Sequence, residues 1–188
     1  MNKSICFTMF LLMLSFSPVY AADLDLAASK ITVRVDKSGM FAAFAHNHII
    51  SAPLASGKLD AEKRTVELKF RSHDMKVLDP GTSDSERSTI ESTMKSDKVL
   101  DPTRFPEISF TSTSIETTDT KRYLVHGSLT LHGVTRPVEL SVSFAEAHYT
   151  GKATIKQTDF NITPVKIAGG AVRVKDPIEI VFDIVPAK

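Results

Sequence analysis

Residues 138–144 read Val138-Glu139-Leu140-Ser141-Val142-Ser143-Phe144. Large apolar side chains occupy every second position, and charged or hydroxyl side chains lie between them. Because successive side chains of a β-strand point to opposite faces, this period predicts a strand with one apolar and one polar face. The same alternation recurs at Val66–Phe70 and at Ile178–Ile184. The chain is therefore predicted to be built from strands that are buried on one side.

Weaker copies of this pattern bring the predicted total to about eight or nine strands. The additional strands are Ile31–Val35, Leu54–Leu59, Ile108–Ser114, Tyr123–Leu131, Ala153–Gln157 and Ala171–Val174. Between two of them, His132-Gly133 stands where a two-residue hairpin turn is expected, because glycine tolerates the positive φ of such turns.

One segment, residues 83–99, lacks the alternation and is predicted to be a short helix. Ile90 and Met94 are spaced as neighbours on one helix face, acidic residues stand in the first turn, and lysines come late. Many antiparallel strands with one short helix indicate an all-β fold, either a barrel or a sandwich. Periodicity does not choose between the two.

The N-terminus has the pattern of an export signal. Lys3 precedes the short apolar run of residues 5–16, and small residues end at Ala21. We therefore expect a signal peptide at residues 1–21, a mature domain at residues 22–188, and a secreted, periplasmic protein. The run is shorter than the roughly 20 apolar residues of a membrane helix, so no stable span is expected after cleavage. Cys6 would be lost with the signal, which excludes disulfides and thiolate chemistry.

Charge and motifs argue against several classes of function. The chain has 23 Lys and Arg against 22 Asp and Glu, and removal of Lys3 leaves 22 of each. This balance gives no reason to expect a nucleic-acid partner. No glycine-flanked serine elbow or phosphate-binding glycine loop is present. The sequence therefore predicts a protein that is not an enzyme and that needs no cofactor.

The most suggestive polar cluster is His46-Asn47-His48. In an extended strand the two histidines would face the same side, roughly 7 Å apart, within reach of one divalent metal. A third ligand would have to come from His73, Asp74 or elsewhere. Structural or ligand-orienting histidines are the other interpretation of the cluster, and the sequence leaves both open.

Apolar strand residues form the second candidate site. They either fill a core or line a pocket, and only their collective arrangement distinguishes the two. With the two histidines, the predicted ligand-binding residues are Phe44, His46, His48, Leu68, Phe70, Phe110, Leu129, Leu131 and Phe144.

Three stretches carry a resemblance to a known family. They are residues 99–113 (VLDPTRFPEISFTST), residues 127–138 (GSLTLHGVTRPV) and residues 159–162 (DFNI). Their order resembles the YceI-like family of periplasmic proteins, which have an extended lipocalin-type barrel and bind polyisoprenoid lipids. The resemblance implies an antiparallel lipocalin-like β-barrel of about eight strands with one short helix. It brings no catalytic residue with it.

The resemblance makes a binding module the leading hypothesis. The barrel would hold an isoprenoid-type lipid or an isoprenoid quinone, with His46, His48 and Arg87 as candidate contacts to a polar head. The first alternative is a metal- or haem-related role of His46 and His48. The second is a fully packed barrel that acts as a protein-interaction module. A homodimer is left open.

Overall fold

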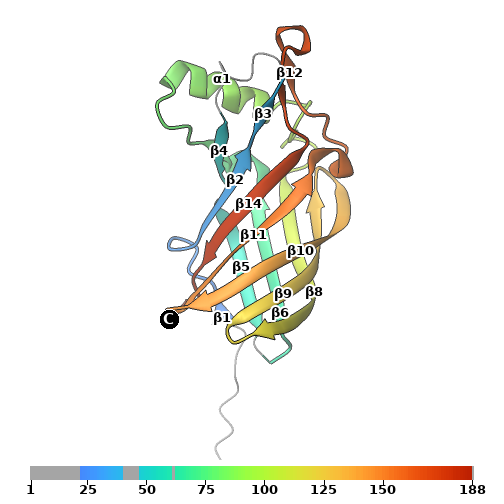
Figure 1. Cartoon of the computed structure of the whole chain (residues 1–188). Coiled ribbons are helices and arrows are strands. Elements are labelled where there is room, and N and C mark those ends of the chain that lie inside the picture. The colour runs from blue at the N-terminus through green and yellow to red at the C-terminus, as the bar shows by residue number, and fades with distance from the viewer. Residues whose placement is uncertain (1–21, 40–46, 61, 188) are drawn as a thin grey trace, which may run out of the picture.

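The computed structural model describes residues 22–39, 47–60 and 62–187. Most of its strands form one curled antiparallel sheet, and among these residues a single α-helix lies at one end (Figure 1). Eight strands have six or more residues. They are β2 (Lys30–Val35), β5 (Leu54–Asp60), β6 (Thr65–Arg71), β8 (Glu107–Asp119), β9 (Arg122–Leu131), β10 (Val134–Ala145), β11 (His148–Lys156) and β14 (Pro177–Ile184).

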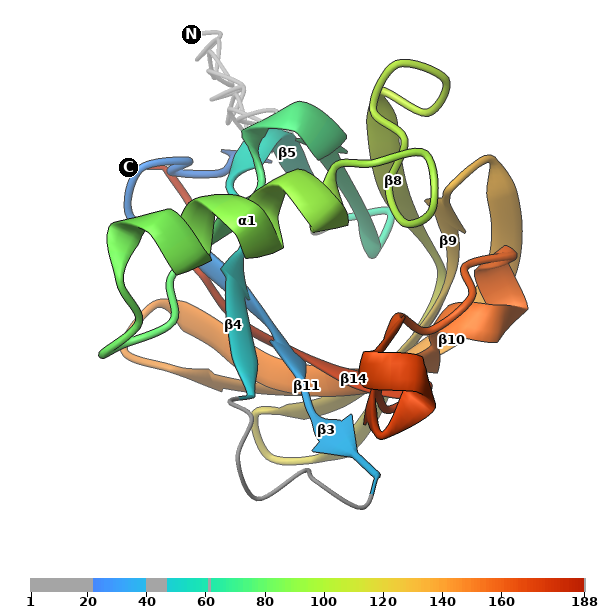
Figure 2. The same ribbon diagram turned by 90° about the horizontal axis from the view of Figure 1, so that it is seen from above.

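Three shorter strands complete the sheet: β1 (Ala22–Asp23), β4 (His48–Ser51) and β7 (Lys76–Val77). The hydrogen-bonded order is β1-β5-β6-β8-β9-β10-β11-β14-β2-β4-β7. Strands β4 and β5 lie near opposite edges of this order, yet only Ala52 and Pro53 separate them in the chain. The chain thus passes directly from one edge to the other, and the sheet curls round on itself as the end view shows (Figure 2).

This geometry confirms the all-β, lipocalin-like barrel and excludes the sandwich that periodicity had left open. The eight long strands match the predicted number. Strands β1, β4 and β7 were not among the predicted strands, because they are too brief to show a clear period of two.

The predicted hairpin is also confirmed. Strands β9 and β10 pair from Leu131 with Val134 to Arg122 with Ser143. Only His132 and Gly133 connect them, and both have positive φ, at 50° and 72°. This is the backbone that a two-residue turn between twisted antiparallel strands requires.

The helix is shorter than the predicted range of 83–99. Helix α1 spans Asp84–Met94, and Ser83 caps it through a reciprocal pair of bonds with Glu86. After Met94 the Ser96 hydroxyl donates to the Thr93 carbonyl (2.7 Å), and the backbone N–H of Leu100 bonds to the Met94 carbonyl (3.1 Å). A serine side chain that competes for the last carbonyls favours a turn over another helical turn, so Lys95 to Val99 leave the helix.

Short elements lie mainly at the α1 end. A three-stranded sheet joins β12 (Lys166–Ile167), β13 (Val172–Val174) and β3 (Lys37–Ser38). The 3-10 turns are η2 (Ser72–Asp74), η3 (Gln157–Phe160) and η4 (Ala168–Gly170). Figure 1 places β3, β12 and α1 at the same end of the barrel, away from β1 and the C-terminus.

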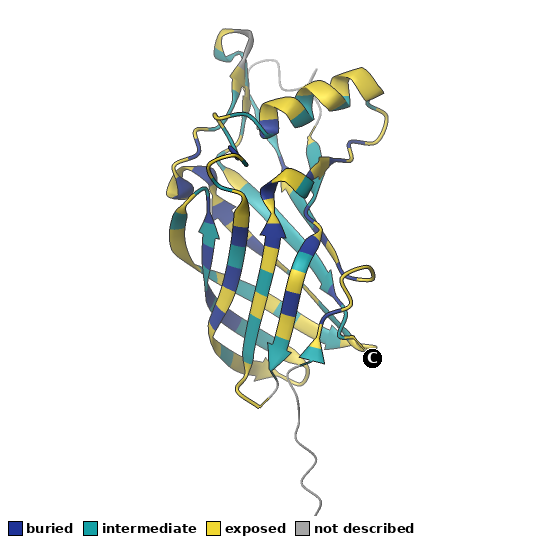
Figure 3. Ribbon diagram, turned by 180° about the vertical axis from the view of Figure 1, so that it is seen from behind, coloured by how far each residue is buried: buried dark blue, intermediate teal, exposed yellow. Residues whose placement is uncertain are grey.

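Burial alternates along the strands, as the sequence pattern predicts (Figure 3). In β9 the inward residues Val125, Gly127, Leu129 and Leu131 are buried, while the residues between them are half-buried. The buried side chains form one connected cluster on the inner face of the curled sheet. Phe160 of η3 is 1% exposed and anchors the cluster near the α1 end. The barrel interior is therefore partly side-chain core, and the rest is the cavity described next.

Candidate ligand cavity

A cavity of about 670 Å³ lies inside the barrel. Its wall is formed by the inward side chains of β2, β4, β6, β8, β9, β10, β11 and β14, together with one face of α1. Sites for small organic ligands usually have volumes of about 300–1,000 Å³ and mainly apolar walls. The volume is therefore large enough to hold a ligand in addition to the packed side chains.

The wall is divided by polarity along the barrel. Its long side is apolar and includes Ile31, Val33, Ile50, Leu68, Phe70, Ile108, Phe110, Leu129, Leu140, Ile155, Ile180 and Phe182. Its polar residues come from α1, from the segments that lead into it, and from the strand ends beside it: Asp36, Lys37, His48, Thr82, Ser85, Glu86, Thr89, Thr93, Gln157 and Arg173. The cavity is thus amphiphilic, with its polar groups gathered at the end that α1 covers.

Six of the nine predicted binding residues line this cavity: His48, Leu68, Phe70, Phe110, Leu129 and Leu131. Three of them form a row across the sheet, because Phe110 of β8 is the direct partner of Leu68 on β6 and of Leu129 on β9. Direct partners in an antiparallel sheet present their side chains to the same face. Phe44 and His46 lie outside the described residues.

Phe144 has the inward parity but is not part of the cavity wall. It stands near the end of β10, and its ring packs against that of Tyr149 on β11, with centroids 4.6 Å apart. Burial raises the pKa of the Tyr149 hydroxyl, and the nearby Tyr123 adds to the effect. Phe144 therefore belongs to an aromatic contact at the end of the barrel away from α1.

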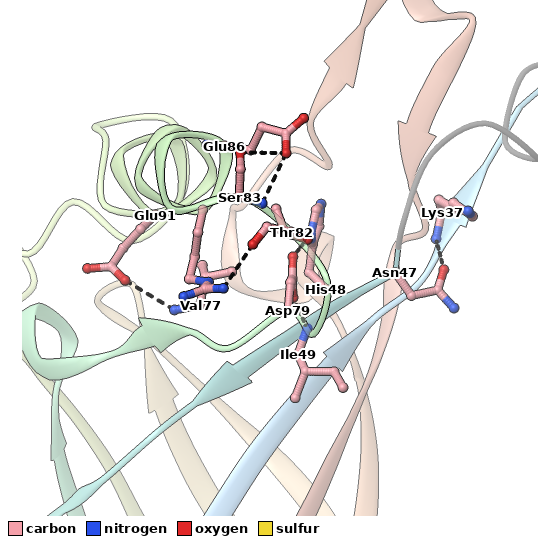
Figure 4. A network of polar contacts seen from close by, with 11 residues as sticks. Lys37, Asn47, His48, Ile49, Val77, Asp79, Thr82, Ser83, Glu86 and Glu91 are labelled. Atoms are coloured by element: carbon pink, nitrogen blue, oxygen red, sulfur yellow. Dashed lines mark hydrogen bonds and ion pairs between the residues drawn. The ribbon is translucent and has the colours of Figure 1, made fainter.

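His48 is held in place by a buried carboxylate that sequence reasoning did not single out. Its Nδ1 lies 2.6 Å from Oδ2 of Asp79, and Oδ1 of Asp79 accepts the backbone N–H of Ile49 at 2.7 Å (Figure 4). Asp79 is only 1% exposed, whereas the His48 side chain is 25% exposed and faces the cavity. A carboxylate that fixes one ring nitrogen sets the orientation of the other.

Sequence signals for Asp79 were weak. Asp79-Pro80-Gly81 has the composition of a turn, and an aspartate in such a position usually bonds to nearby backbone. The contact with His48 joins residues 31 positions apart. Only the pairing of β4 with β7, which Asp79 follows closely, brings these residues together.

Helix α1 contributes its inward face to the cavity and turns Arg87 away from it. Thr82, Ser85, Thr89 and Thr93 line the wall, whereas Arg87 does not. One terminal nitrogen of Arg87 bonds to Asp84 (3.2 Å) and the other donates to the Thr82 carbonyl (3.0 Å). The prediction that Arg87 contacts a head group is therefore not supported by its position.

For a metal site, the described residues bring no three histidine, aspartate, glutamate or cysteine side chains into a suitable group. His73 is exposed and lies 4.0 Å from its neighbour Asp74. Because His46 is not described, the proposed His46–His48 pair stays a prediction. Within the described ranges, moreover, no helix is both long and apolar enough to cross a bilayer.

Comparison with known proteins shows to which family a chain with this geometry is similar. The family model of the YceI-like domain matches residues 23–185. A UPF0312 protein of Pseudomonas savastanoi pv. phaseolicola is 32% identical over 117 residues, which cover 57% of this chain and 56% of that protein. A UPF0312 protein of Pectobacterium carotovorum is 31% identical over 97 residues, 46% of this chain and 50% of that protein. The chain thus spans about half the length of the curated relatives it matches.

Solved structures show the same fold. The crystal structure of BcnA from Burkholderia cenocepacia superposes with a TM-score of 0.65 at 21% identity, covering 88% of this chain and all of that one. The YceI protein of Campylobacter jejuni superposes with a TM-score of 0.50 at 17% identity, covering 74% of this chain and 81% of the other. At these identities the likeness concerns the fold alone.

Proposed function

The chain belongs to the YceI-like family, and we propose that its barrel binds one elongated apolar molecule with a polar head, of the isoprenoid lipid or isoprenoid quinone type. The observation that carries this proposal is the amphiphilic cavity, apolar along the strands and polar beneath α1. Such a wall matches a molecule with a long hydrocarbon tail and one polar end. The protein would act by binding rather than by catalysis.

The driving force for binding would be burial of the tail. Each methylene group removed from water contributes roughly 0.8 kcal/mol, and association itself costs about 4–15 kcal/mol in lost freedom. A tail of several isoprene units is long enough to exceed that cost without any charged contact. The cavity also weighs against the alternative of a fully packed barrel, which would have no room for a ligand.

We also propose that the protein works in the periplasm, as a carrier or store. The signal-like segment at residues 1–21 supports export. A molecule with a long isoprenoid tail dissolves poorly in the aqueous space between two membranes. A barrel that encloses the tail would keep it soluble during transfer.

Native mass spectrometry of the protein isolated gently from its own periplasm tests this proposal. We expect a stoichiometric mass increase, and extraction should release a molecule with an isoprenoid tail. A protein that carries no organic ligand would contradict the carrier function. A protein that carries only a metal ion would do the same and would favour the role of His46 and His48.

A pair of variants on one strand controls for binding outside the barrel. Leu140→Trp adds bulk to the cavity wall, whereas Ser141→Trp adds the same side chain to the exposed face of β10. We expect the first to weaken the affinity at least about tenfold, because overlap with a ligand costs more than about 1.4 kcal/mol. The second should leave it unchanged. Equal occupancy in both variants would place the ligand elsewhere.

A further inference from the structure

The polar end of the cavity includes a group of hydrogen-bond acceptors beside α1, and His48 is the first of them. An ionised carboxylate accepts but does not donate, so the contact with Asp79 places a proton on Nδ1 of His48. In the neutral form of the ring with its proton on Nδ1, Nε2 carries the lone pair. Among the described residues, none hydrogen-bonds to this nitrogen, although His48 lines the cavity.

Two threonines of α1 provide further hydrogen-bond acceptors. The hydroxyl of Thr89 donates to the Ser85 carbonyl, and the hydroxyl of Thr93 donates to the Thr89 carbonyl, both at 3.0 Å. Their protons are therefore used within the helix, while their oxygens keep lone pairs that can accept. Both threonines line the cavity on the face of α1 that covers it.

From this arrangement we propose that the barrel selects a ligand whose head is uncharged and carries a hydroxyl group, and that this hydroxyl donates to Nε2 of His48. The inference rests on the proposed function and names the chemistry of the head. An anionic head group offers only acceptors, so it could not donate a hydrogen bond to Nε2 of His48 or to the two threonine oxygens. Asp79 is then a positioning residue, because its contact with Nδ1 orients the ring and leaves Nε2 facing the ligand.

Charged side chains at the same end of the cavity raise the alternative of a phosphorylated head group. Lys37 and Arg173 line the wall there, while Asp36 is paired with Lys175 at 3.1 Å. Glu86 adds a carboxylate to the same wall, and Asp79 adds another behind His48. The local charge is thus close to balanced and gives a phosphate group little net attraction. Preference for a phosphorylated ligand is nevertheless the result that would overturn the proposal.

A competition assay tests the proposal. Three ligands with the same short tail compete with an uncharged fluorescent naphthylamine probe for the cavity. The ligands are farnesol, farnesyl methyl ether and farnesyl diphosphate, measured on the mature protein. The ether keeps the oxygen but lacks the proton that His48 would accept. We expect farnesol to bind roughly five- to tenfold more tightly than the ether, as for the loss of one hydrogen bond. The diphosphate should bind no better than farnesol.

The variant Asp79→Asn makes the role of His48 testable without removing a side chain. The asparagine oxygen can still accept the Ile49 N–H, while its amide group donates to Nδ1 and moves the ring proton to Nε2. His48 would then donate from Nε2 to either oxygen, so the ether gains a hydrogen bond while the alcohol keeps one. The preference for alcohol over ether should therefore fall to within about twofold, through tighter binding of the ether. A merely structural role would weaken both ligands together.

Asp183→Asn is the matched control. Asp183 contacts Nδ1 of His148 at 2.6 Å, the same geometry, but neither residue lines the cavity. This variant should keep the wild-type preference. Equal binding of alcohol and ether to the wild type, or a preference that Asp79→Asn leaves intact, would overturn this inference while the barrel still binds tails. Failure of all three ligands to displace the probe would overturn the proposed function as well.

Discussion

At the scale of single residues, the site depends on how a few side chains are held. The sequence singled out His48 because of its neighbour His46, which lies outside the described residues. The structure adds a partner for His48 that the sequence did not indicate, the buried Asp79. Residue type therefore indicated that His48 belongs to the site but not which group forms a hydrogen bond with it. A residue without a side chain can also shape the cavity wall, as Gly127 does.

Gly127 of β9 lies beneath the ring of Phe110, a cavity-lining residue of β8. A Cβ atom at this position would overlap that ring and approach the Thr111 carbonyl oxygen to 2.7 Å. We predict that Gly127→Val lowers the free energy of unfolding by about 1–3 kcal/mol, because the wall must move to admit the side chain. Urea denaturation followed by circular dichroism measures the loss.

The neighbouring substitution Ser128→Ala is the control, since Ser128 has the opposite parity on the same strand. Its effect should stay within about 0.5 kcal/mol. If Gly127→Val proved as stable as the wild type, the close packing of Phe110 over this glycine would be wrong.

At the scale of elements, α1 is tied to the sheet through Glu91. One carboxylate oxygen of Glu91 accepts the backbone N–H of Val77 on β7 (3.1 Å), and the other accepts from Lys95 (2.7 Å). The bond from Lys95, followed by that from Val77, holds the pKa of the Glu91 carboxyl below its ordinary value of 4.5. The helix that covers the cavity is thus fastened by an ionised side chain.

A lowered pKa in the folded state means that the ionised form stabilises the fold. This contribution is fully present above pH 4.5, the ordinary value, and is lost as the pH falls through the lowered pKa. We predict that Glu91→Gln lowers the free energy of unfolding by about 0.5–1 kcal/mol near neutral pH. The difference from the wild type should shrink below pH 4.5.

Urea midpoints measured across this pH range test the prediction, with Glu146→Gln in the exposed turn after β10 as the control for loss of one carboxylate. A difference that stayed constant down to strongly acidic pH would show that ionisation of Glu91 is not what holds α1. Hydrogen exchange of the α1 amides would report the same change locally.

At the scale of the whole molecule, stability and binding are linked through the cavity. A ligand that binds only the folded barrel raises the free energy of unfolding by about 2.7 kcal/mol when its concentration is a hundred times Kd. For a domain of this size we predict that an isoprenoid alcohol at that concentration raises Tm by roughly 5–10 °C. Differential scanning fluorimetry with and without farnesol measures the shift.

The variant Leu140→Trp should lose this shift, because its indole occupies the space of the ligand, and Ser141→Trp should keep it. A shift of equal size in both variants would indicate stabilisation through the outer surface. In that case the cavity would not be the binding site.

Local pattern was sufficient for the long strands and for the family. The alternation in β6, β10 and β14, the turn at His132-Gly133 and the position of the helix could all be predicted, because each depends on neighbours in the chain. The resemblance carried by the β9–β10 hairpin was confirmed by the match to residues 23–185. The predicted length of the helix was wrong after Met94, where a single hydroxyl favours a turn.

The sequence by itself determined which face of each strand is apolar, and therefore that Leu68, Phe110 and Leu129 point inward together. Only the tertiary structure decided that this interior keeps a cavity of about 670 Å³, that its polar end lies beside α1, and that the buried Asp79 holds Nδ1 of His48. The physical reason is the separation along the chain of the residues that interact. Periodicity follows from bonds between adjacent residues, whereas a cavity and a contact across 31 positions depend on how the curled sheet brings distant strands together.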